Sequence, residues 1–293
     1  MSKPLHAAHY ADRARQATVT VVENVQLARD TFRVRFECPE IARQIVPGQF
    51  LMHKLAGCDD PLLGRPLALY DTVLSTEQEP IGVDIVYLVL GKMTRRLSLF
   101  QPGEQLTVWG PLGNGFPPPE PNEEHLIMVA GGIGQTPFMA LAREALGQRR
   151  YGDASRTRPQ RSPQVTLCYG ARTADYFAGV EEFRQLGVDV RLSTDDGSLG
   201  HHGFVTDLLR NALAESPQAR VVCCGPEPMM EAVAKITAAT NTRCQVSLET
   251  PMACGIGICF SCVARVRDET GGWDYKRTCV EGPIFEATQI VWS

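Results

Sequence analysis

The sequence lacks the features typical of membrane, secreted or nucleic-acid-binding proteins. No apolar run approaches the about 20 residues that a membrane-spanning helix needs, and the first residues show no hydrophobic stretch typical of a secretion signal. Lys and Arg form no runs apart from a short stretch near Arg149, and the net charge at pH 7 is −4. This balance argues against nucleic acid or an acidic membrane as the main partner, so we expect a cytoplasmic protein.

Familiar catalytic side-chain patterns are missing as well. We find no catalytic triad and no Lys or Cys placed as an evident nucleophile, so we expect bound cofactors to supply the chemistry. The 293 residues are 44% apolar, which is ordinary for a globular protein and enough for two domains and a small third. Of the ten cysteines, six are expected mostly as small buried thiols: Cys38, Cys58, Cys168, Cys223, Cys224 and Cys244.

The chain divides into four segments by its hydrophobic pattern. Residues 1–17 are polar and aperiodic, which predicts a tail. Residues 18–118 contain short β-rich runs separated by turns and one short helix after Thr94, which predicts a small antiparallel barrel. The expected strands are Thr18–Val22, Thr31–Glu37, Gln49–Leu55, Ile81–Leu90 and Gln105–Trp109.

Beyond the barrel, strands alternate with helices in residues 119–240, which predicts a parallel α/β sheet. The expected strands are 126–130, 165–169, 188–192 and 220–224, and the expected helices are 138–146, 180–186, 206–214 and 229–239. Residues 148–163 are predicted to form a surface loop. Residues 241–293 return to short strands around a cysteine-rich loop.

That loop carries the most specific pattern in the chain. Cys254, Cys259 and Cys262 follow the spacing C-x4-C-x2-C, and Cys279 comes later. Plant-type ferredoxins hold a [2Fe–2S] cluster with this spacing, two thiolates to each iron. The two glycines between the first two cysteines predict a tight loop with positive φ angles. A zinc site, which usually shows two C-x2-C knuckles, and a chance group of buried cysteines are the alternatives.

Two weaker patterns in the barrel support each other as a flavin dinucleotide site. Arg65 stands directly before Pro66, so that a guanidinium suited to a phosphate adjoins a fixed backbone. Gly91 to Thr94 would open a short helix whose N-terminal amides face a pyrophosphate. A surface arginine beside a turn proline is the alternative for the first pattern.

Three patterns in the α/β segment point to a nicotinamide nucleotide. Residues 131–137, G-G-I-G-Q-T-P, follow a strand and precede a helix, as a dinucleotide loop does, although the full G-x-G-x-x-G text is absent. A second strand ends at Cys223 and Cys224, and we assign the former to the core and the latter to the nicotinamide pocket. The polar loop 194–203 contains two adjacent histidines that are expected to be solvated rather than bound to metal. Since a flavin exchanges both hydride and single electrons, it must lie between nicotinamide and cluster.

The motifs, in this order, resemble those of one known family. They are P-G-Q-F at 47–50, R-P at 65–66, G-P-L-G-N-G-F at 110–116, G-G-x-G-x-x-P at 131–137, T-D-D-G-S-x-G at 194–200, C-G-P at 224–226, the four cysteines and C-V-E-G-P-I-F at 279–285. This order resembles the electron-transfer subunit of class 1B dihydroorotate dehydrogenase, an iron–sulfur flavoprotein of the ferredoxin reductase-like superfamily. The first motifs are common to that superfamily, and the cysteine loop that leads into G-P-I-F discriminates this family.

The resemblance implies an α+β multidomain fold: an antiparallel flavin-binding β-barrel, a parallel α/β nucleotide-binding domain and a small C-terminal [2Fe–2S] domain. It implies Cys254, Cys259, Cys262 and Cys279 as cluster ligands. FAD would be lined by Arg65, Pro66, Leu67, Ala68, Val86, Tyr87, Leu88, Met93 and Thr94, and the nicotinamide cofactor by Gly132, Gly134, Thr136 and Cys224. By the same resemblance, electrons pass from the FMN of a catalytic partner through the cluster and FAD to NAD+ in pyrimidine biosynthesis, within a heterotetramer.

Three departures from the family pattern bear on these expectations. Ala68 stands where the family has a hydroxyl residue, the helix-opening glycine pair is reduced to Gly91 with Met93, and the N-terminal extension is unusual. Arg172 follows a sheet strand where a 2′-phosphate would lie, so the choice between NADH and NADPH stays open. The alternatives are a small FAD and [2Fe–2S] subunit of a transhydrogenase, sulfide dehydrogenase or hydrogenase complex, and a zinc-stabilised binding module.

Overall fold

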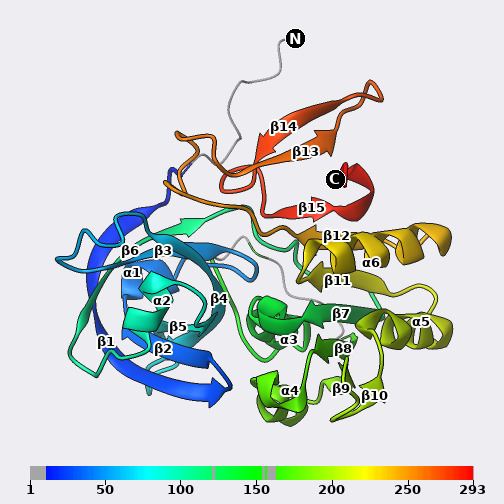
Figure 1. The fold of residues 1–293 in the computed structure, drawn as a ribbon, viewed down its shortest axis with the longest axis horizontal. Helices are drawn as coiled ribbons and strands as arrows, with labels where there is room; N and C mark the ends of the chain where they lie inside the picture. Colours follow the sequence, from blue (N-terminus) through cyan, green and yellow to red (C-terminus); the bar gives the residue numbers. More distant parts are fainter. Residues whose placement is uncertain (1–10, 121–122, 154–155, 157–162, 293) are drawn as a thin grey trace.

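The computed structural model describes residues 11–120, 123–153, 156 and 163–292. Figure 1 shows three parts: a barrel on the left, an α/β layer structure on the right, and the cysteine-rich segment with a hairpin above both. No helix among the described residues is long and apolar enough to cross a bilayer.

The first part is a closed antiparallel barrel of six strands, as predicted, in the order β1-β2-β5-β4-β3-β6. Alternating side chains such as Val34, Phe36 and Leu51 fill its interior. The strands are β1 Arg15–Ala28, β2 Thr31–Glu37, β3 Phe50–Leu55, β4 Arg65–Leu74, β5 Pro80–Leu88 and β6 Gln105–Leu112, and the short helices are α1 Pro39–Ala42 and α2 Lys92–Leu97.

One boundary of the barrel differs from the sequence-based expectation: β1 begins at Arg15, within the predicted tail, because residues 15–17 pair with β6. β4 contains the R-P stretch and is the sixth strand, beyond the five whose bounds the pattern gives. The short helix begins at Lys92, so residues 91–94 open it as expected. The Thr94 hydroxyl accepts a hydrogen bond from the Gly91 backbone N–H, 3.2 Å away, and so caps the first turn.

The second part is a seven-stranded sheet in the order β10-β9-β8-β7-β11-β12-β15. All neighbours are parallel except the pair β12 and β15, so the predicted parallel α/β fold is confirmed. The strands are β7 His125–Gly131, β8 Gln164–Ala171, β9 Asp189–Thr194, β10 His201–His202, β11 Arg220–Cys224, β12 Cys244–Ser247 and β15 Ile284–Glu286; the helices are α3 Phe138–Ala145, α4 Val180–Gln185, α5 Val205–Glu215 and α6 Glu227–Ala239, with short 3-10 turns η1 Gly132–Gln135, η2 Ala174–Tyr176 and η3 Ala287–Gln289.

The cysteine-rich segment leaves this sheet and returns to it. β12 precedes the cysteine loop, β15 follows it, and both pair within the same sheet. Between them, β13 Val263–Arg267 and β14 Trp273–Arg277 form an antiparallel hairpin. The loop is therefore anchored at both ends to the α/β part. Half of the predicted surface loop 148–163 lies outside the described residues.

A buried charge network fixes the barrel against the α/β part. Asp71 of β4 forms ion pairs with Arg143 of α3, at 2.8 Å, and with Arg149, at 2.9 Å, and the Tyr151 hydroxyl donates a hydrogen bond to it at 2.6 Å. Burial raises the pKa of Asp71, although the two arginines and Tyr151 oppose that shift. The network fixes the C-terminal end of α3 and the residues that follow it against β4 of the barrel.

Candidate functional site

Three cysteines of the predicted cluster motif lie in the loop before β13, and the fourth, Cys279, follows β14. Gly255 and Gly257 have φ angles of +74° and +78°, which confirms the tight turn expected between the first two ligands. Cys262 and Cys279 are buried, Cys254 is half-buried and Cys259 is exposed. The loop thus presents one thiol to solvent and directs two towards the protein.

The thiols form two pairs. The hydroxyl and backbone of Ser261 lower the pKa of Cys259 to about 6, and its thiol also bonds with that of Cys254. The Cys279 thiol donates to Cys262, which lowers the pKa of Cys262 to about 6 and raises that of Cys279. Within the described residues, no three His, Cys, Asp or Glu side chains converge on one point suited to a single metal ion. Two thiol pairs fit a binuclear cluster, in which each iron takes two thiolates.

The loop packs on the barrel. Cys262 and Cys279 share an apolar cluster with Phe50 and Met52 of β3 and Leu112 of β6. A methyl group on Gly255 would lie 2.6 Å from Cγ of Met52, so glycine is needed for this close approach. The cluster site therefore lies against the outside of strand β3.

The predicted flavin motif occupies the neighbouring strand. Arg65 to Ala68 open β4, in which Pro66 lies opposite Met52 and Ala68 opposite Phe50. Because opposed residues share a face of the sheet, Pro66 and Ala68 lie on the same outer face as the cluster loop. Arg65 is exposed, and its Nη1 donates to the Leu63 carbonyl at 3.1 Å.

The other predicted flavin residues are brought near this strand with different orientations. Val86, Tyr87 and Leu88 end β5, which pairs with β4, but the Tyr87 ring lies in the barrel core with its hydroxyl 3.0 Å from Oδ1 of Asn24. Burial raises the pKa of Tyr87. Met93 is likewise buried in the barrel core, and the Thr94 hydroxyl caps α2. Tyr87 and Met93 thus offer the backbone, rather than the side chain, to a ligand.

The predicted nicotinamide residues meet at the carboxyl edge of the sheet. Gly132 has a φ of +55°, and a methyl group on Gly134 would overlap the carbonyl of Cys224. Strand β7, which leads into the two glycines, and strand β11, which ends at Cys224, are neighbours. Thr136 is buried just before α3. This glycine-lined edge is where ligands of open α/β sheets bind.

Two polar residues at this edge were missed from the sequence. Ser247 lies opposite Cys224 in the sheet and hydrogen-bonds to its thiol. Burial, and then the charge of Glu249, raise the pKa of the Cys224 thiol to about 12. Burial also raises the pKa of Glu249. The sequence does not predict Ser247 and Glu249 at this edge, because nothing in it shows that β12 pairs with β11.

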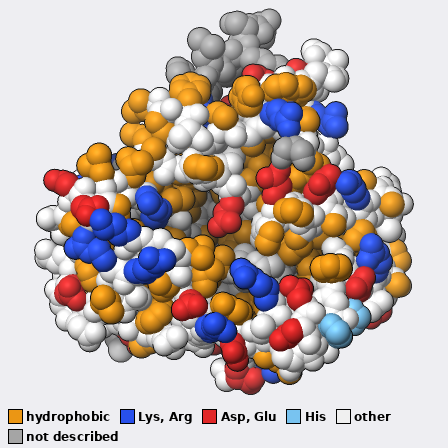
Figure 2. Space-filling view, in the orientation of Figure 1, with side chains coloured by type: hydrophobic (Ala, Val, Ile, Leu, Met, Phe, Trp, Pro, Cys, Tyr) orange, Lys and Arg blue, Asp and Glu red, His pale blue; other side chains and the backbone are white. Residues whose placement is uncertain are grey.

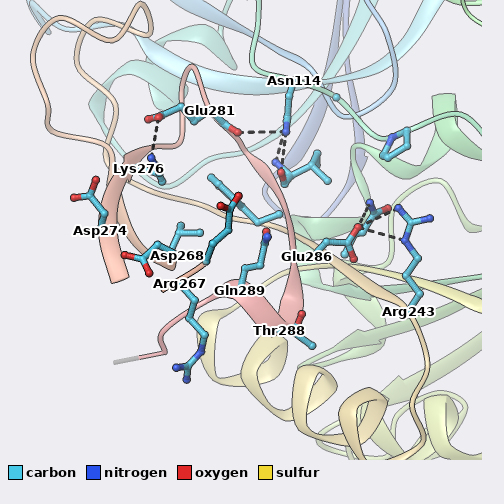
Figure 3. A pocket seen from close by; sticks show the side chains of 17 residues that line it. Asn114, Arg243, Arg267, Asp268, Asp274, Lys276, Glu281, Glu286, Thr288 and Gln289 are labelled. Atoms are coloured by element: carbon cyan, nitrogen blue, oxygen red, sulfur yellow. Dashed lines mark hydrogen bonds and ion pairs between the residues drawn. The ribbon is translucent and has the colours of Figure 1, made fainter. Parts of the chain in front are cut away.

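Glu249 also lines a cavity of about 330 Å³ together with Gly225 and Pro226 at the start of α6. A larger cavity of about 910 Å³ lies between the hairpin, β15 and the segment after the barrel. Figure 3 shows charged side chains around it, including Arg243, Asp274 and Glu281. The residues that line this larger cavity do not include any of the predicted site residues.

The remaining predictions concern single side chains. Cys223 is fully buried, which confirms its assignment to the core. Cys38, Cys168 and Cys244 are also buried, whereas Cys58 and Cys224 are half-buried. His201 and His202 are exposed, as expected for solvated histidines. Arg172 follows β8 directly and is exposed at the same edge.

Comparison with known protein families assigns three consecutive domains. An oxidoreductase FAD-binding domain matches residues 18–116, an oxidoreductase NAD-binding domain matches residues 128–235, and the iron–sulfur cluster binding domain of dihydroorotate dehydrogenase B matches residues 249–291.

Curated relatives are similar over nearly the whole chain. The "dihydroorotate dehydrogenase B (NAD(+)), electron transfer subunit" of Desulforamulus reducens is 35% identical over 267 residues, which are 91% of this chain and 94% of that protein. The protein of the same description from Shouchella clausii is 33% identical over 282 residues, covering 95% and 99%.

Solved structures show the same architecture. The NADH-dependent reduced ferredoxin-NADP oxidoreductase, described in relation to flavin-based electron bifurcation, is 28% identical with a TM-score of 0.76 and covers 94% of this chain and 90% of its own. The cytochrome P450 reductase of Amycolatopsis, 24% identical with a TM-score of 0.62, covers 78% of this chain and 66% of its own and shares the fold.

Proposed function

Because this chain belongs to the family of the electron transfer subunits of dihydroorotate dehydrogenase B, we propose that it relays electrons between a catalytic partner subunit and NAD+. An electron transfer subunit implies such a partner. When bound, the [2Fe–2S] cluster supplies one-electron exchange, and FAD connects it to the two-electron chemistry of NAD. In pyrimidine biosynthesis, we propose that electrons flow from dihydroorotate, through the partner's FMN, to NAD+, which is reduced to NADH.

One observation carries this proposal: the paired cysteines lie against the barrel strand that adjoins the flavin motif. Met52 of β3 contacts Gly255 of the cysteine loop. In the sheet, Met52 lies opposite Pro66 of the neighbouring strand β4. The α/β part that carries the glycine-lined edge is joined to the same barrel by the Asp71 network. The chain therefore arranges its sites in the order that the relay needs.

We propose the following residues for each cofactor. In the division expected from the sequence, residues 18–118 bind FAD, 119–240 bind NAD and 241–293 hold the cluster. Cys254, Cys259, Cys262 and Cys279 ligate the iron. Side chains and backbone around FAD come from Arg65, Pro66, Leu67, Ala68, Val86, Tyr87, Leu88, Met93 and Thr94. The nicotinamide cofactor lies along Gly132, Gly134, Thr136 and Cys224.

The exposed tip of the cysteine loop is the surface that we propose for the FMN-containing partner in a heterotetramer. Ile258 and Phe260 flank the exposed Cys259 and are 67% and 63% exposed. Figure 2 shows hydrophobic side chains gathered over the upper part of the molecule, where Figure 1 places this loop. Since four adjacent thiols would oxidise to disulfides in an oxidising compartment, we propose the cytoplasm as the location.

The direct experiment is co-purification of the chain from native cells, followed by an assay of the isolated complex for orotate formation with NAD+. NAD-dependent oxidation of dihydroorotate supports the proposed relay. A complex that instead oxidises or reduces another substrate, without forming orotate, supports the alternative of a related oxidoreductase complex. A colourless protein that carries one zinc overturns both.

Substitution of one iron ligand separates the two halves of the relay. In Cys259→Ser, transfer to one-electron acceptors should be abolished, whereas reduction of the flavin by NADH should persist, because the nicotinamide edge is built from other strands. Cys38→Ser is the matched control, because Cys38 is the N-cap of α1, where serine is favoured. Equal loss of both activities in Cys259→Ser would contradict this division of labour.

A further inference from the structure

One indole ring touches both the cysteine loop and the flavin strand. Trp109 lies on β6, and its Nε1–H donates a hydrogen bond to the backbone carbonyl of Cys254, 2.9 Å away. The six-membered part of the ring lies on Gly64, where an added methyl group would come within 2.6 Å of Cη2 of the indole. Gly64 directly precedes Arg65, the first residue of the flavin motif. A single rigid side chain thus extends from a cluster ligand to the flavin motif.

The strand register places this ring in a row with the other bridging residues. Trp109 lies opposite Met52 across β6 and β3, and Met52 lies opposite Pro66 across β3 and β4. Opposed residues share a face, so the three side chains form one row on the outside of the barrel. Trp109 holds the loop at Cys254, and Met52 holds it at Gly255. Two successive loop residues are therefore fixed to the same row.

We propose that Trp109 is a positioning residue that sets the separation and orientation of the cluster relative to the flavin. This inference rests on the proposed function. The Nε1–H bond fixes the loop at the first iron ligand, and the packing of the ring on Gly64 fixes that bond relative to Arg65. Since electron transfer slows steeply with separation, a loop released from the indole passes electrons more slowly while each cofactor site stays intact.

Beside the packing on Met52, the other hydrogen bonds of this loop among the described residues come from its own segment. The Thr278 hydroxyl and N–H both donate to the Cys262 carbonyl, at 3.0 and 2.8 Å, and Nη1 of Arg277 donates to the Gly257 carbonyl at 3.1 Å. These bonds shape the loop internally. The Trp109 bond instead joins it to another domain, 145 residues away in sequence.

The test uses the holoprotein with Trp109→Phe, which keeps an aromatic ring against Gly64 and removes the N–H donor. NADH is the electron source, and one electron enters each cluster. Flavin reduction is followed by visible absorbance, and cluster reduction by EPR after rapid freezing. We expect unchanged flavin reduction and slower cluster reduction, because the loss of a bond worth about 1 kcal/mol shifts the docking equilibrium of the loop roughly fivefold towards the released form. Trp273→Phe, at an exposed hairpin tryptophan, is the control and should change neither rate.

A second variant acts on the same contact from the other side. Gly64→Ala should displace the indole and slow cluster reduction in the native background, but add little in the Trp109→Phe background, where the smaller ring leaves room for the methyl group. Independent, additive effects of the two substitutions would show that the contact does not act as one unit.

A third readout does not require the relay. Hydrogen exchange of residues 250–262 should quicken in Trp109→Phe and stay unchanged in Trp273→Phe. A wild-type protein that shows no flavin-to-cluster transfer would overturn the proposed function. A wild-type protein that transfers electrons, combined with a Trp109→Phe variant of equal rate and equal exchange, would overturn this inference alone.

Discussion

At the scale of single residues, burial controls the ionisation of the groups around the site. His53 of β3 is completely buried in the barrel, next to the ring of Phe36, and burial lowers its pKa to about 4. The Nδ1 atom lies 3.1 Å from the Leu51 carbonyl, which favours the protonated ring but does not outweigh the loss of solvation. β3, which carries Met52 at the centre of the row with Trp109 and Pro66, therefore contains a neutral histidine.

The histidine makes stability depend on pH in a defined window. The pKa of histidine in the unfolded chain is near 6.5. Between that value and about 4, His53 is therefore protonated in the unfolded chain and neutral in the folded chain. The contribution of neutral His53 to the free energy of unfolding is roughly 3 kcal/mol in total. It is fully present above pH 6.5 and is lost as the pH falls to about 4. In His53→Gln the free energy of unfolding, measured in urea from pH 7.5 to 4.5, should fall less than in the wild type. Parallel pH profiles would contradict the assignment.

At the scale of elements, the sequence predicts what local patterns encode and misses what distant pairing creates. The strands and helices of the α/β part agree within about two residues, because each is marked by its own hydrophobic period. The bounds of β4 are not predicted because Pro66 breaks its pattern, and the edge position of Glu249 is not predicted because β12 pairs with β11 through tertiary contacts.

The candidate site shows the same division. The cysteine spacing and its two glycines predict the loop conformation, since both concern adjacent residues. The contacts of Trp109 with Cys254 and Gly64 join three separate segments. No residue spacing in the sequence predicts these contacts. The inward ring of Tyr87 also depends on strand phase within the closed barrel, which the motif alone does not determine.

The tip of the cysteine loop yields a prediction at this scale. Replacing Ile258 and Phe260 by serine should weaken binding of the purified catalytic subunit about 30-fold, since an exposed aromatic anchor of an interface contributes about 2 kcal/mol. The visible spectrum of the cluster should be retained. Phe204→Ser is the matched control, because Phe204 is 72% exposed before α5. The docking surface lies elsewhere if titration calorimetry gives equal affinities for the double variant and wild type.

At the scale of the whole molecule, the relay depends on three parts that keep fixed positions. The cysteine segment is anchored in the α/β sheet through β12 and β15 and bonded to the barrel through Trp109. The barrel is in turn joined to the α/β part by Asp71 and its two arginines. Each part thus contacts the other two, so that one loosened junction disturbs more than one cofactor site.

The Asp71 junction provides a stability test. In Asp71→Asn, two half-buried arginines lose their carboxylate, which should lower the free energy of unfolding by about 2 kcal/mol, less than for a fully buried pair because both arginines keep some solvent. Asp59→Asn, which removes the exposed partner of Lys54, should change it by less than about 0.5 kcal/mol. Urea unfolding measures the change in the free energy of unfolding for both variants. Equal changes would show that the Asp71 network contributes no more to stability than an exposed ion pair.

The central claim is that one chain joins a nicotinamide site, a flavin and a [2Fe–2S] cluster into a single path. The most direct measurement is the EPR spectrum of the anaerobic protein after reduction by NADH, quantified against iron and flavin. The account predicts bleaching of the flavin together with the signal of a reduced [2Fe–2S] centre that Cys259→Ser removes. An EPR-silent protein that contains flavin but no iron would contradict it.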